Sequence, residues 1–197
     1  MTDEKRPYRK TRRAEHEEGT RRRITESAVA LHGTVGPART SISALAEHAG
    51  VRRSTVYRHF PDEAALFAAC SAHWLAHNPL PDPGRWLAID DADERVRTAL
   101  DELYAFYRRT ARMMENILRD EPLVPELTQT LDGYRGYLTA AREVLMTGRP
   151  PDPSVAAAIG HGLTFTTWRS LAVEQGLDDR RAASLMARLA AVVAAAV

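Results

Sequence analysis

Apolar residues recur at spacings of three and four along most of the chain, which predicts α-helices from one end to the other. The first helix is expected over residues 20–32, with its buried face formed by Ile24, Ala28 and Leu31. Residues 1–19 lack such a stripe. They run from the basic "KRPYRKTRR" into the acidic "EHEE", and this polar composition predicts a disordered basic arm.

The next segment predicts two short helices joined by a tight turn. "GTVGPART" interrupts the first helix, and Thr40 or Ser41 can cap a second one. Gly50 stands where a left-handed residue ends that helix. A third helix is expected over residues 53–58, and a fourth begins at Pro61 and Asp62 and runs to about residue 77. This order is the helix-turn-helix pattern.

The remainder predicts a larger helical body after the proline-rich hinge "NPLPDPGRW", residues 78–86. A fifth helix starts at "DDADE", "ARMMENILRDE" forms a short sixth helix, and the seventh begins at "PLVPEL" and ends before residues 147–153. The eighth is expected over 154–175 and the ninth over 179–195. The fold prediction is all-α with about nine helices, divided into an arm (1–19), a head with its connecting helix (20–77) and a body (78–197).

Composition narrows the class of protein. The start of the chain has no apolar run that predicts a secretory signal, and no apolar stretch is long enough to span a membrane. A single cysteine, Cys70, fits a reducing, cytoplasmic compartment. The first 60 residues hold 13 Lys and Arg against seven acids, whereas the rest holds 14 against 19. A basic head on an acidic body indicates an anion-binding segment and a body that binds something else, although basic tails often only aid solubility.

"VRRSTVYRHF", residues 51–60, alternates aromatic and cationic side chains. A buried helix does not accommodate three guanidinium groups, and a purely solvated face does not require Tyr57 and Phe60. We therefore predict a surface that meets an anionic partner, with nucleic acid as the first candidate. The alternative is a set of ordinary solvated arginines around a core helix.

"TSISALAEHAGVRRSTVYRHFPDEAAL", residues 40–66, resembles the DNA-binding signature of the tetracycline-repressor (TetR) family of transcriptional regulators. The matching elements are the Ala-Glu-x-Ala-Gly-Val turn from Ala46, the Thr-x-Tyr-x-His-Phe run from Thr55, and Leu66. The resemblance covers about the first 75 residues. The rest is similar only in being an all-helical body of suitable size.

This resemblance implies that the third helix enters the major groove of double-stranded operator DNA. Arg53 can pair with guanine, and Ser54 and Thr55 are placed at base edges. Tyr57 and His59 match positions that contact phosphates in the family. The DNA-binding residues are predicted to be Thr40, Ser41, Arg52, Arg53, Ser54, Thr55, Tyr57, Arg58 and His59.

Two positions depart from the family pattern. Glu63 replaces a lysine that usually meets a phosphate, and it suits the first turn of a helix instead. Arg52 replaces the usual Ser or Thr cap of the third helix, so that helix is expected to start loosely. Basic side chains of the arm can add phosphate or minor-groove contacts; they are Arg9, Lys10, Arg12 and Arg13, with Arg21, Arg22 and Arg23.

The last two helices are rich in small apolar residues on more than one face, which indicates a partner. In the family this pair forms a four-helix bundle with its copy, so the resemblance implies a homodimer that reads a pseudo-palindromic operator. The alternative is a helix pair buried within one chain. The interface residues are predicted to be Ile159, Leu163, Leu185, Leu189 and Val193.

The resemblance also implies a cavity in the body for a small effector that releases a repressor from DNA. Met and polar-tipped aromatic residues suit a mostly apolar ligand, although any one such residue is more often part of an ordinary core. The candidate lining is Tyr104, Tyr107, Met113, Met114, Asn116, Tyr134, Tyr137, His161, Phe165 and Trp168. The rival interpretation is a DNA-binding dimer without a small-molecule effector, controlled by a protein partner or by its own concentration.

An enzyme is not expected. His73 and His77 stand one helical turn apart, but they lack the glutamate of an H-E-x-x-H motif and have no evident third ligand. The sequence has no phosphate-binding loop and no nucleophile elbow, and Cys70 lies in no catalytic motif. No cofactor and no metal are therefore predicted.

Overall fold

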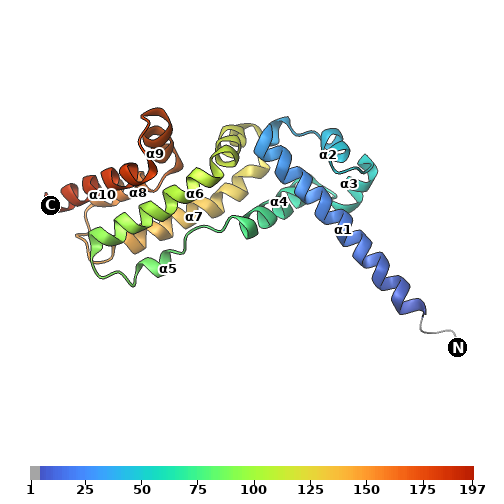
Figure 1. Cartoon of the computed structure of the whole chain (residues 1–197), viewed down its shortest axis with the longest axis horizontal. Helices are drawn as coiled ribbons and strands as arrows, with labels where there is room; N and C mark the ends of the chain where they lie inside the picture. Colours follow the sequence, from blue (N-terminus) through green and yellow to red (C-terminus); the bar gives the residue numbers. More distant parts are fainter. Residues whose placement is uncertain (1–4) are drawn as a thin grey trace. The chain divides into compact units, whose positions relative to one another are not determined.

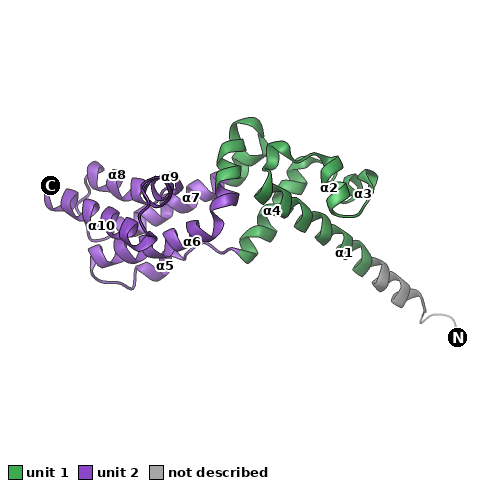
Figure 2. Ribbon diagram, turned by 45° about the horizontal axis from the view of Figure 1, so that its top comes forward, with its two compact units in different colours: residues 1–77, 115–130 green, residues 78–114, 131–197 purple. Residues whose placement is uncertain are grey.

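The computed structural model describes residues 5–197, with side chains from residue 14 onward, and this part of the chain is helical without a strand. It forms two compact units, shown in different colours in Figure 2. The first, called the head, comprises Met1–His77 and Glu115–Thr130. The second, called the body, comprises Asn78–Met114 and Leu131–Val197. None of the described helices is long and apolar enough to cross a lipid bilayer.

The head contains four helices of the N-terminal part of the chain, drawn in blue to green in Figure 1. Helix α4 packs along α1, and α2 contacts both α1 and α3. Ile24, Leu45 and Val56 are at most 1% exposed and occupy the centre of a common core. The elements are α1 (Lys5–Thr34), the 3-10 turn η1 (Pro37–Arg39), α2 (Ile42–His48), α3 (Arg53–His59) and α4 (Glu63–His77).

Helix α1 corrects the prediction of a disordered arm, because it begins at Lys5 instead of residue 20. The segment is rich in Arg, Lys and Glu, which favour helices, and Pro7 lies in the first turn, where the missing N–H has no helical partner. The basic side chains predicted for the arm from Arg9 to Arg13 belong to residues whose side chains the structure does not describe. Residues 1–4 are not described at all.

The head also includes a segment from the middle of the chain, which the predicted boundary had assigned to the body. It contains the end of α6 (Ala92–Asp120), η2 (Glu121–Leu123) and the start of α7 (Glu126–Met146). Asn116 donates from Nδ2 to the carbonyl of His32 at 2.8 Å. Asp120 accepts at Oδ2 from the backbone N–H of Ala38 at 3.0 Å. Such side-chain bonds to backbone groups cannot be derived from helical periodicity.

The body is built from the remainder of α6 and α7 together with the C-terminal helices. Helices α8 and α10 pack along one another. Its buried core includes Trp86, whose indole nitrogen donates to Glu102 Oε2 at 2.9 Å. The further elements are α5 (Pro83–Trp86), α8 (Pro153–Gly162), α9 (Phe165–Arg169), the π-helical turn η3 (Ser170–Glu174) and α10 (Asp179–Ala195).

Three predicted boundaries in the body were wrong. The expected fifth and sixth helices are one helix, α6, since no Gly or Pro interrupts residues 92–120. The expected eighth helix ends at Gly162, and Thr164 starts α9 by accepting at Oγ1 from the N–H of Thr167 at 3.2 Å. The proline-rich hinge contains the short helix α5, which Asp82 caps. In contrast, α10 ends at Ala195 as predicted.

Candidate nucleic-acid interface

The turn between α2 and α3 is fixed by local interactions that the sequence predicts. Ser41 caps α2 by accepting at Oγ from the N–H of Ala44 at 3.1 Å. Gly50 follows α2 with a φ of +65°, the left-handed conformation that glycine adopts without strain. The N–H of Val51 then donates to the carbonyl of Ala46 at 2.9 Å and closes the turn. The two helices therefore have the compact helix-turn-helix arrangement.

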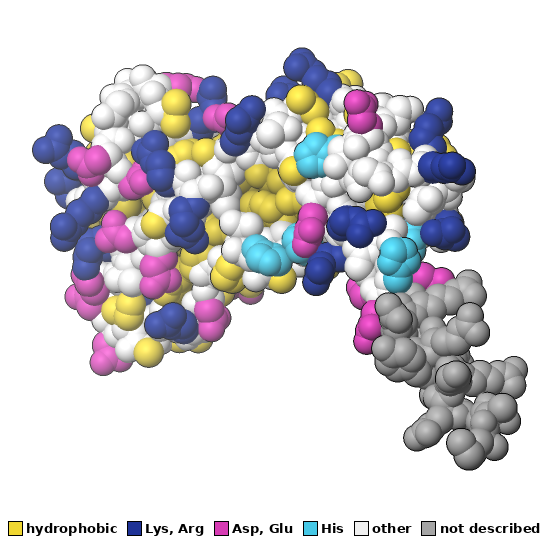
Figure 3. All heavy atoms as spheres, turned by 45° about the vertical axis from the view of Figure 1, so that its right-hand side comes forward, with side chains coloured by type: hydrophobic (Ala, Val, Ile, Leu, Met, Phe, Trp, Pro, Cys, Tyr) yellow, Lys and Arg dark blue, Asp and Glu magenta, His cyan; other side chains and the backbone are white. Residues whose placement is uncertain are grey.

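Helix α3 has one buried and one exposed face. Val56 and Phe60 are 1% and 2% exposed and pack into the head. Tyr57 is 49% exposed, so its ring lies at the surface of the head. The exposed side chains of α3 and its N-cap are Arg52, Arg53, Ser54, Tyr57 and Arg58. In Figure 3, Lys and Arg side chains gather at the end of the head that carries α2 and α3.

The C-terminal end of α3 is attached to α1 by Arg21. Its Nη1 donates to the carbonyl of His59 at 2.6 Å, and its guanidinium lies over the ring of Phe60 at 4.3 Å. The sequence predicts that Arg21 can contact DNA, and in the structure Arg21 makes a bond within the head. Burial, followed by the positive charges of Arg58 and Arg21, lowers the pKa of His59. A neutral imidazole is therefore favoured there.

The structure describes both positions that depart from the family pattern, Arg52 and Glu63. Arg52 occupies the N-cap of α3 and makes no side-chain cap bond. Glu63 is exposed in the first turn of α4. The cap of α4 is Asp62, which accepts at Oδ1 from the N–H of Ala65 at 2.7 Å.

Two further residues predicted to bind DNA are threonines. Thr40 donates from Oγ1 to the carbonyl of Gly36 at 2.8 Å. Thr55 is half-buried.

Several predicted ligand residues come together in the body, where they pack against one another. Tyr104, Tyr107 and Trp168 are fully buried, and the ring centroids of Tyr107 and Phe165 are 5.4 Å apart. Tyr104 donates to the carbonyl of Gly162 at 2.9 Å. The aromatic rings therefore form a large part of the body core.

The polar tips of this cluster are mostly satisfied within the body. Tyr134 donates to the hydroxyl of Tyr107 at 2.6 Å, and Tyr107 donates to the carbonyl of Leu163 at 2.6 Å. Trp168 donates from Nε1 to Asp179 Oδ1 at 2.9 Å. Tyr137 differs, because its buried hydroxyl has no hydrogen-bond partner among the described residues.

The remaining predicted ligand residues lie at other positions. Met114 is buried, Met113 is half-buried, and His161 is exposed with Nε2 3.2 Å from Thr167 Oγ1. Asn116 belongs to the head through its bond to His32, so the structure does not bring it together with the body aromatics.

The predicted interface residues divide into buried and exposed sets. Ile159 and Leu163 are 2% and 0% exposed inside the body, so their assignment to an interface is corrected: they are core residues of one chain. On α10, Leu185 and Val193 are half-buried and Leu189 is 48% exposed. Their spacing places them along one side of the helix.

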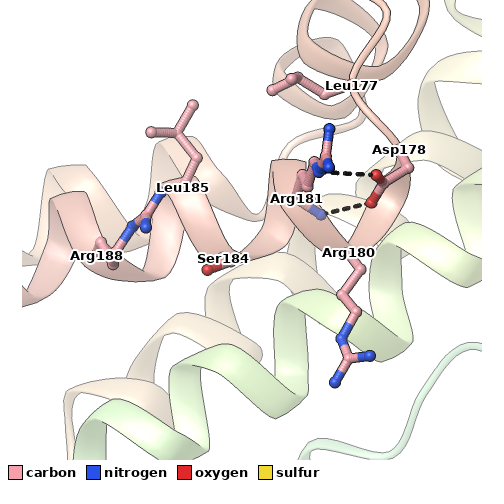
Figure 4. A pocket seen from close by; sticks show the side chains of 7 residues that line it. All are labelled: Leu177, Asp178, Arg180, Arg181, Ser184, Leu185 and Arg188. Atoms are coloured by element: carbon pink, nitrogen blue, oxygen red, sulfur yellow. Dashed lines mark hydrogen bonds and ion pairs between the residues drawn. The ribbon is translucent and has the colours of Figure 1, made fainter.

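A hollow of about 610 Å³ lies beside the first half of α10. Figure 4 shows Leu185 and Arg188 directed away from Arg180, and Arg181 held by Asp178. Asp178 accepts at Oδ1 from the N–H of Arg181 at 2.8 Å and pairs through Oδ2 with its Nε at 3.3 Å. The full lining is Leu177, Asp178, Arg180, Arg181, Ser184, Leu185 and Arg188. This lining forms an open surface. Its apolar residue Leu185 lies four residues before Leu189 on α10.

Comparison with known proteins finds a family model that matches the head and solved structures with a similar fold. Residues 24–70 match the model of bacterial regulatory proteins of the tetR family. No curated protein sequence is significantly similar to the chain. The fold is similar to that of a Mesorhizobium loti protein assigned to the TetR family, with 18% identity, a TM-score of 0.64, and 90% of this chain and 97% of the other covered.

Two further solved structures give the same result. A TetR-like transcriptional regulator from Rhodococcus sp. RHA1 is 19% identical, with a TM-score of 0.61 and coverage of 87% of this chain and 93% of the other. NalD, the secondary repressor of the MexAB-OprM multidrug efflux pump in Pseudomonas aeruginosa, is 19% identical, with a TM-score of 0.59 and coverage of 89% and 95%.

Proposed function

We propose that this chain is a repressor that binds a pseudo-palindromic operator as a homodimer. Its DNA-binding head matches the tetR-family model, and its fold is that of TetR-family transcriptional regulators. We further propose that a small, mostly apolar effector releases it from DNA. The family consists of DNA-binding regulators, so the prediction that the chain is not an enzyme agrees with its membership.

The exposed face of α3 is the observation that supports DNA recognition most directly. Arg53 and Ser54 occupy the first turn of α3, the part of a recognition helix that reaches base edges. Arg53 supplies a guanidinium that can bond to O6 and N7 of guanine. Arg52, Tyr57 and Arg58 flank it and supply phosphate contacts, while Val56 and Phe60 hold the helix on the head.

The experiment is operator binding by the wild type and an Arg53→Ala variant on a panel of single-base operator variants. Loss of a bidentate base contact is expected to cost about 1–3 kcal/mol and to relax preference at one position of each half-site. Arg85→Ala, at an exposed arginine of α5, is the matched control. Unchanged affinity and unchanged preference in Arg53→Ala would remove the base-reading role.

The homodimer proposal is supported by α10. Leu185, Leu189 and Val192 stand at spacings of four and three, and Leu189 and Val192 are 48% and 67% exposed. Contiguous exposed apolar side chains on a helix typically mark an interaction site. A dimer would supply two recognition helices, as a pseudo-palindrome requires.

The effector proposal is supported by the body aromatics, and in particular by Tyr137. Burial raises the pKa of this hydroxyl and keeps it protonated, and it has no partner among the described residues. A ligand with one acceptor group would satisfy it. The body carries 13 acidic and 13 basic side chains, so it has no net charge that would select an anionic effector.

The effector-free alternative is supported by the tight packing of Tyr104, Tyr107 and Trp168, whose polar atoms already have partners. A thermal-shift screen with apolar and aromatic compounds separates the two. A compound that raises the melting temperature and weakens operator binding supports the effector, by mass action and linkage. If no compound stabilises the protein, the alternative holds.

A further inference from the structure

The head contains a hollow of about 310 Å³ that is separate from the exposed face of α3. Its walls come from the end of α1, the segment before α2, α2 itself, α4 and the connection after α6, all of which belong to the head. Most of its lining is apolar, and Leu123 at its edge is 70% exposed. The lining residues are His32, Pro37, Ala38, Thr40, Ile42, Leu45, Glu63, Leu66, Phe67, Leu123 and Val124.

His32 is the polar group of this hollow that the fold leaves without a partner. Its side chain is 5% exposed, and its ring is stacked on Phe67 with centroids 5.1 Å apart and planes inclined by 15°. Its backbone carbonyl accepts from Asn116. Among the described residues, neither ring nitrogen of His32 has a hydrogen-bond partner. Neither nitrogen is among the fully buried side-chain atoms without a partner, so both are accessible to a molecule in the hollow.

The protonation state of His32 defines what it offers to a ligand. Burial lowers the pKa of His32 to about 4, against a smaller opposing effect of Asp120. The ring is therefore neutral at pH 7, with one nitrogen that donates and one that accepts.

The charge of the lining selects among ligands. Glu63 contributes a carboxylate, and the lining includes no Lys or Arg. An anion would therefore be repelled and a cation attracted. The apolar walls and the stacked pair of His32 and Phe67 favour a flat ring. A volume near 300 Å³ is at the small end of ligand sites, so a one- or two-ring molecule fits better than a drug-sized one.

We propose that this hollow is a binding site for a small aromatic amine, whose ring lies against Phe67 and Leu45, with a ring N–H directed to His32 and the ammonium directed to Glu63. This site differs from the effector site proposed for the body. A ligand in it would lie between α2 and α4 and act on the DNA-binding head itself.

The test uses tryptamine as the probe and the full-length protein labelled with ¹³C at histidine. The chain has seven histidines, so the ring resonance of His32 can be assigned with a His32→Gln variant. Tryptamine is expected to shift this resonance saturably, whereas indole-3-propionate, with the same ring and a carboxylate on a chain of equal length, is expected to bind more weakly. A response to neither compound, or an equal response to both, would overturn the proposal.

Variants around the hollow sharpen the test. Glu63→Gln is expected to weaken tryptamine binding about two- to fivefold, the range of an exposed ion pair. Glu47→Gln, an exposed carboxylate on α2 outside the lining, is expected to leave it unchanged. Ala38→Leu is expected to abolish the shift by filling the hollow. Binding that persists in Ala38→Leu would place the ligand elsewhere. Because the readout is a head resonance measured without DNA, it does not depend on the body effector.

Discussion

Arg21 of α1 donates to the backbone carbonyl of His59, the last residue of α3, over 2.6 Å, and its guanidinium covers the ring of Phe60. A helix leaves its last carbonyl groups without helical partners. One of these carbonyls is satisfied here by a cation, which also suits the negative end of the helix dipole. Arg21 therefore attaches the C-terminal end of α3 to α1, in addition to the core contacts of Val56 and Phe60.

Replacing Arg21 with alanine is expected to lower the free energy of unfolding by about 1–3 kcal/mol, because a charged hydrogen bond and a cation–π contact are lost together. Arg22→Ala is the matched control. The Arg22 guanidinium is exposed and lies 3.7 Å from Glu26, a pair whose loss is expected to change stability by less than about 0.5 kcal/mol. Urea unfolding monitored by circular dichroism measures both, and equal losses would contradict a special role for Arg21.

Gly36 and Gly50 provide a second comparison. Both have positive φ, +98° and +65°, so alanine at either position is strained by about 1 kcal/mol or more. A Cβ at Gly50 meets open space, whereas one at Gly36 runs into the side chains of Arg119 and Asp120. Gly36→Ala is therefore expected to lose at least about 1 kcal/mol more than Gly50→Ala. Thermal unfolding of the two variants decides, and an equal or smaller loss for Gly36→Ala would show that the neighbouring side chains move aside at little cost.

Acid pH is expected to destabilise the protein through His32. Its pKa is about 4 in the folded state and about 6.5 in the unfolded state. Between these values the unfolded chain binds more protons, so the free energy of unfolding falls as the pH falls from about 6.5 to 4. The full difference amounts to about 3 kcal/mol. Above pH 6.5 this contribution is constant.

A His32→Gln variant separates this contribution from other titrating groups. Its unfolding free energy is expected to vary less between pH 7 and 4 than that of the wild type, whereas His48→Gln, at an exposed histidine of α2, is expected to follow the wild type. Urea midpoints measured across this range provide the readout. Parallel pH curves for the wild type and His32→Gln would mean that His32 titrates normally in the folded state.

A single acidic substitution on α10 is expected to dissociate the proposed dimer. Leu189→Glu would place an unpaired charge in the contact between two copies. The wild type is expected to sediment at about twice 21.9 kDa at micromolar concentration, and the variant at about 21.9 kDa. Val173→Glu replaces an exposed apolar residue outside α10 and serves as the control. A monomeric wild type would remove the dimer.

Much of the head could be predicted from the sequence, because its signals are local. The serine before α2 and the left-handed glycine after it act on backbone groups within a few residues, so Ser41 and Gly50 predicted the turn that the structure contains. The 3.6-residue period likewise predicted the inward direction of Val56 and Phe60. These features require no knowledge of distant parts of the chain.

Other features were decided by tertiary structure, because they depend on groups far apart in sequence. Periodicity identifies an apolar residue but not the surface that covers it, so Leu163 was predicted at an interface although the body core covers it. Asn116 was grouped with the body aromatics by its place in the chain, but its amide bonds to a carbonyl 84 residues away.

His32 shows the same limit most clearly. In the sequence it is a polar residue near the end of an amphipathic helix, and nothing nearby indicates burial. Its stacking on Phe67 and its place in the hollow arise only when α1, α4 and the segment after α6 pack together. The sequence by itself determined the turn, the all-helical class and the exposed face of α3, since these follow from short-range hydrogen bonds and periodicity. Only the tertiary structure decided which buried polar groups acquire partners, because that depends on where distant segments meet.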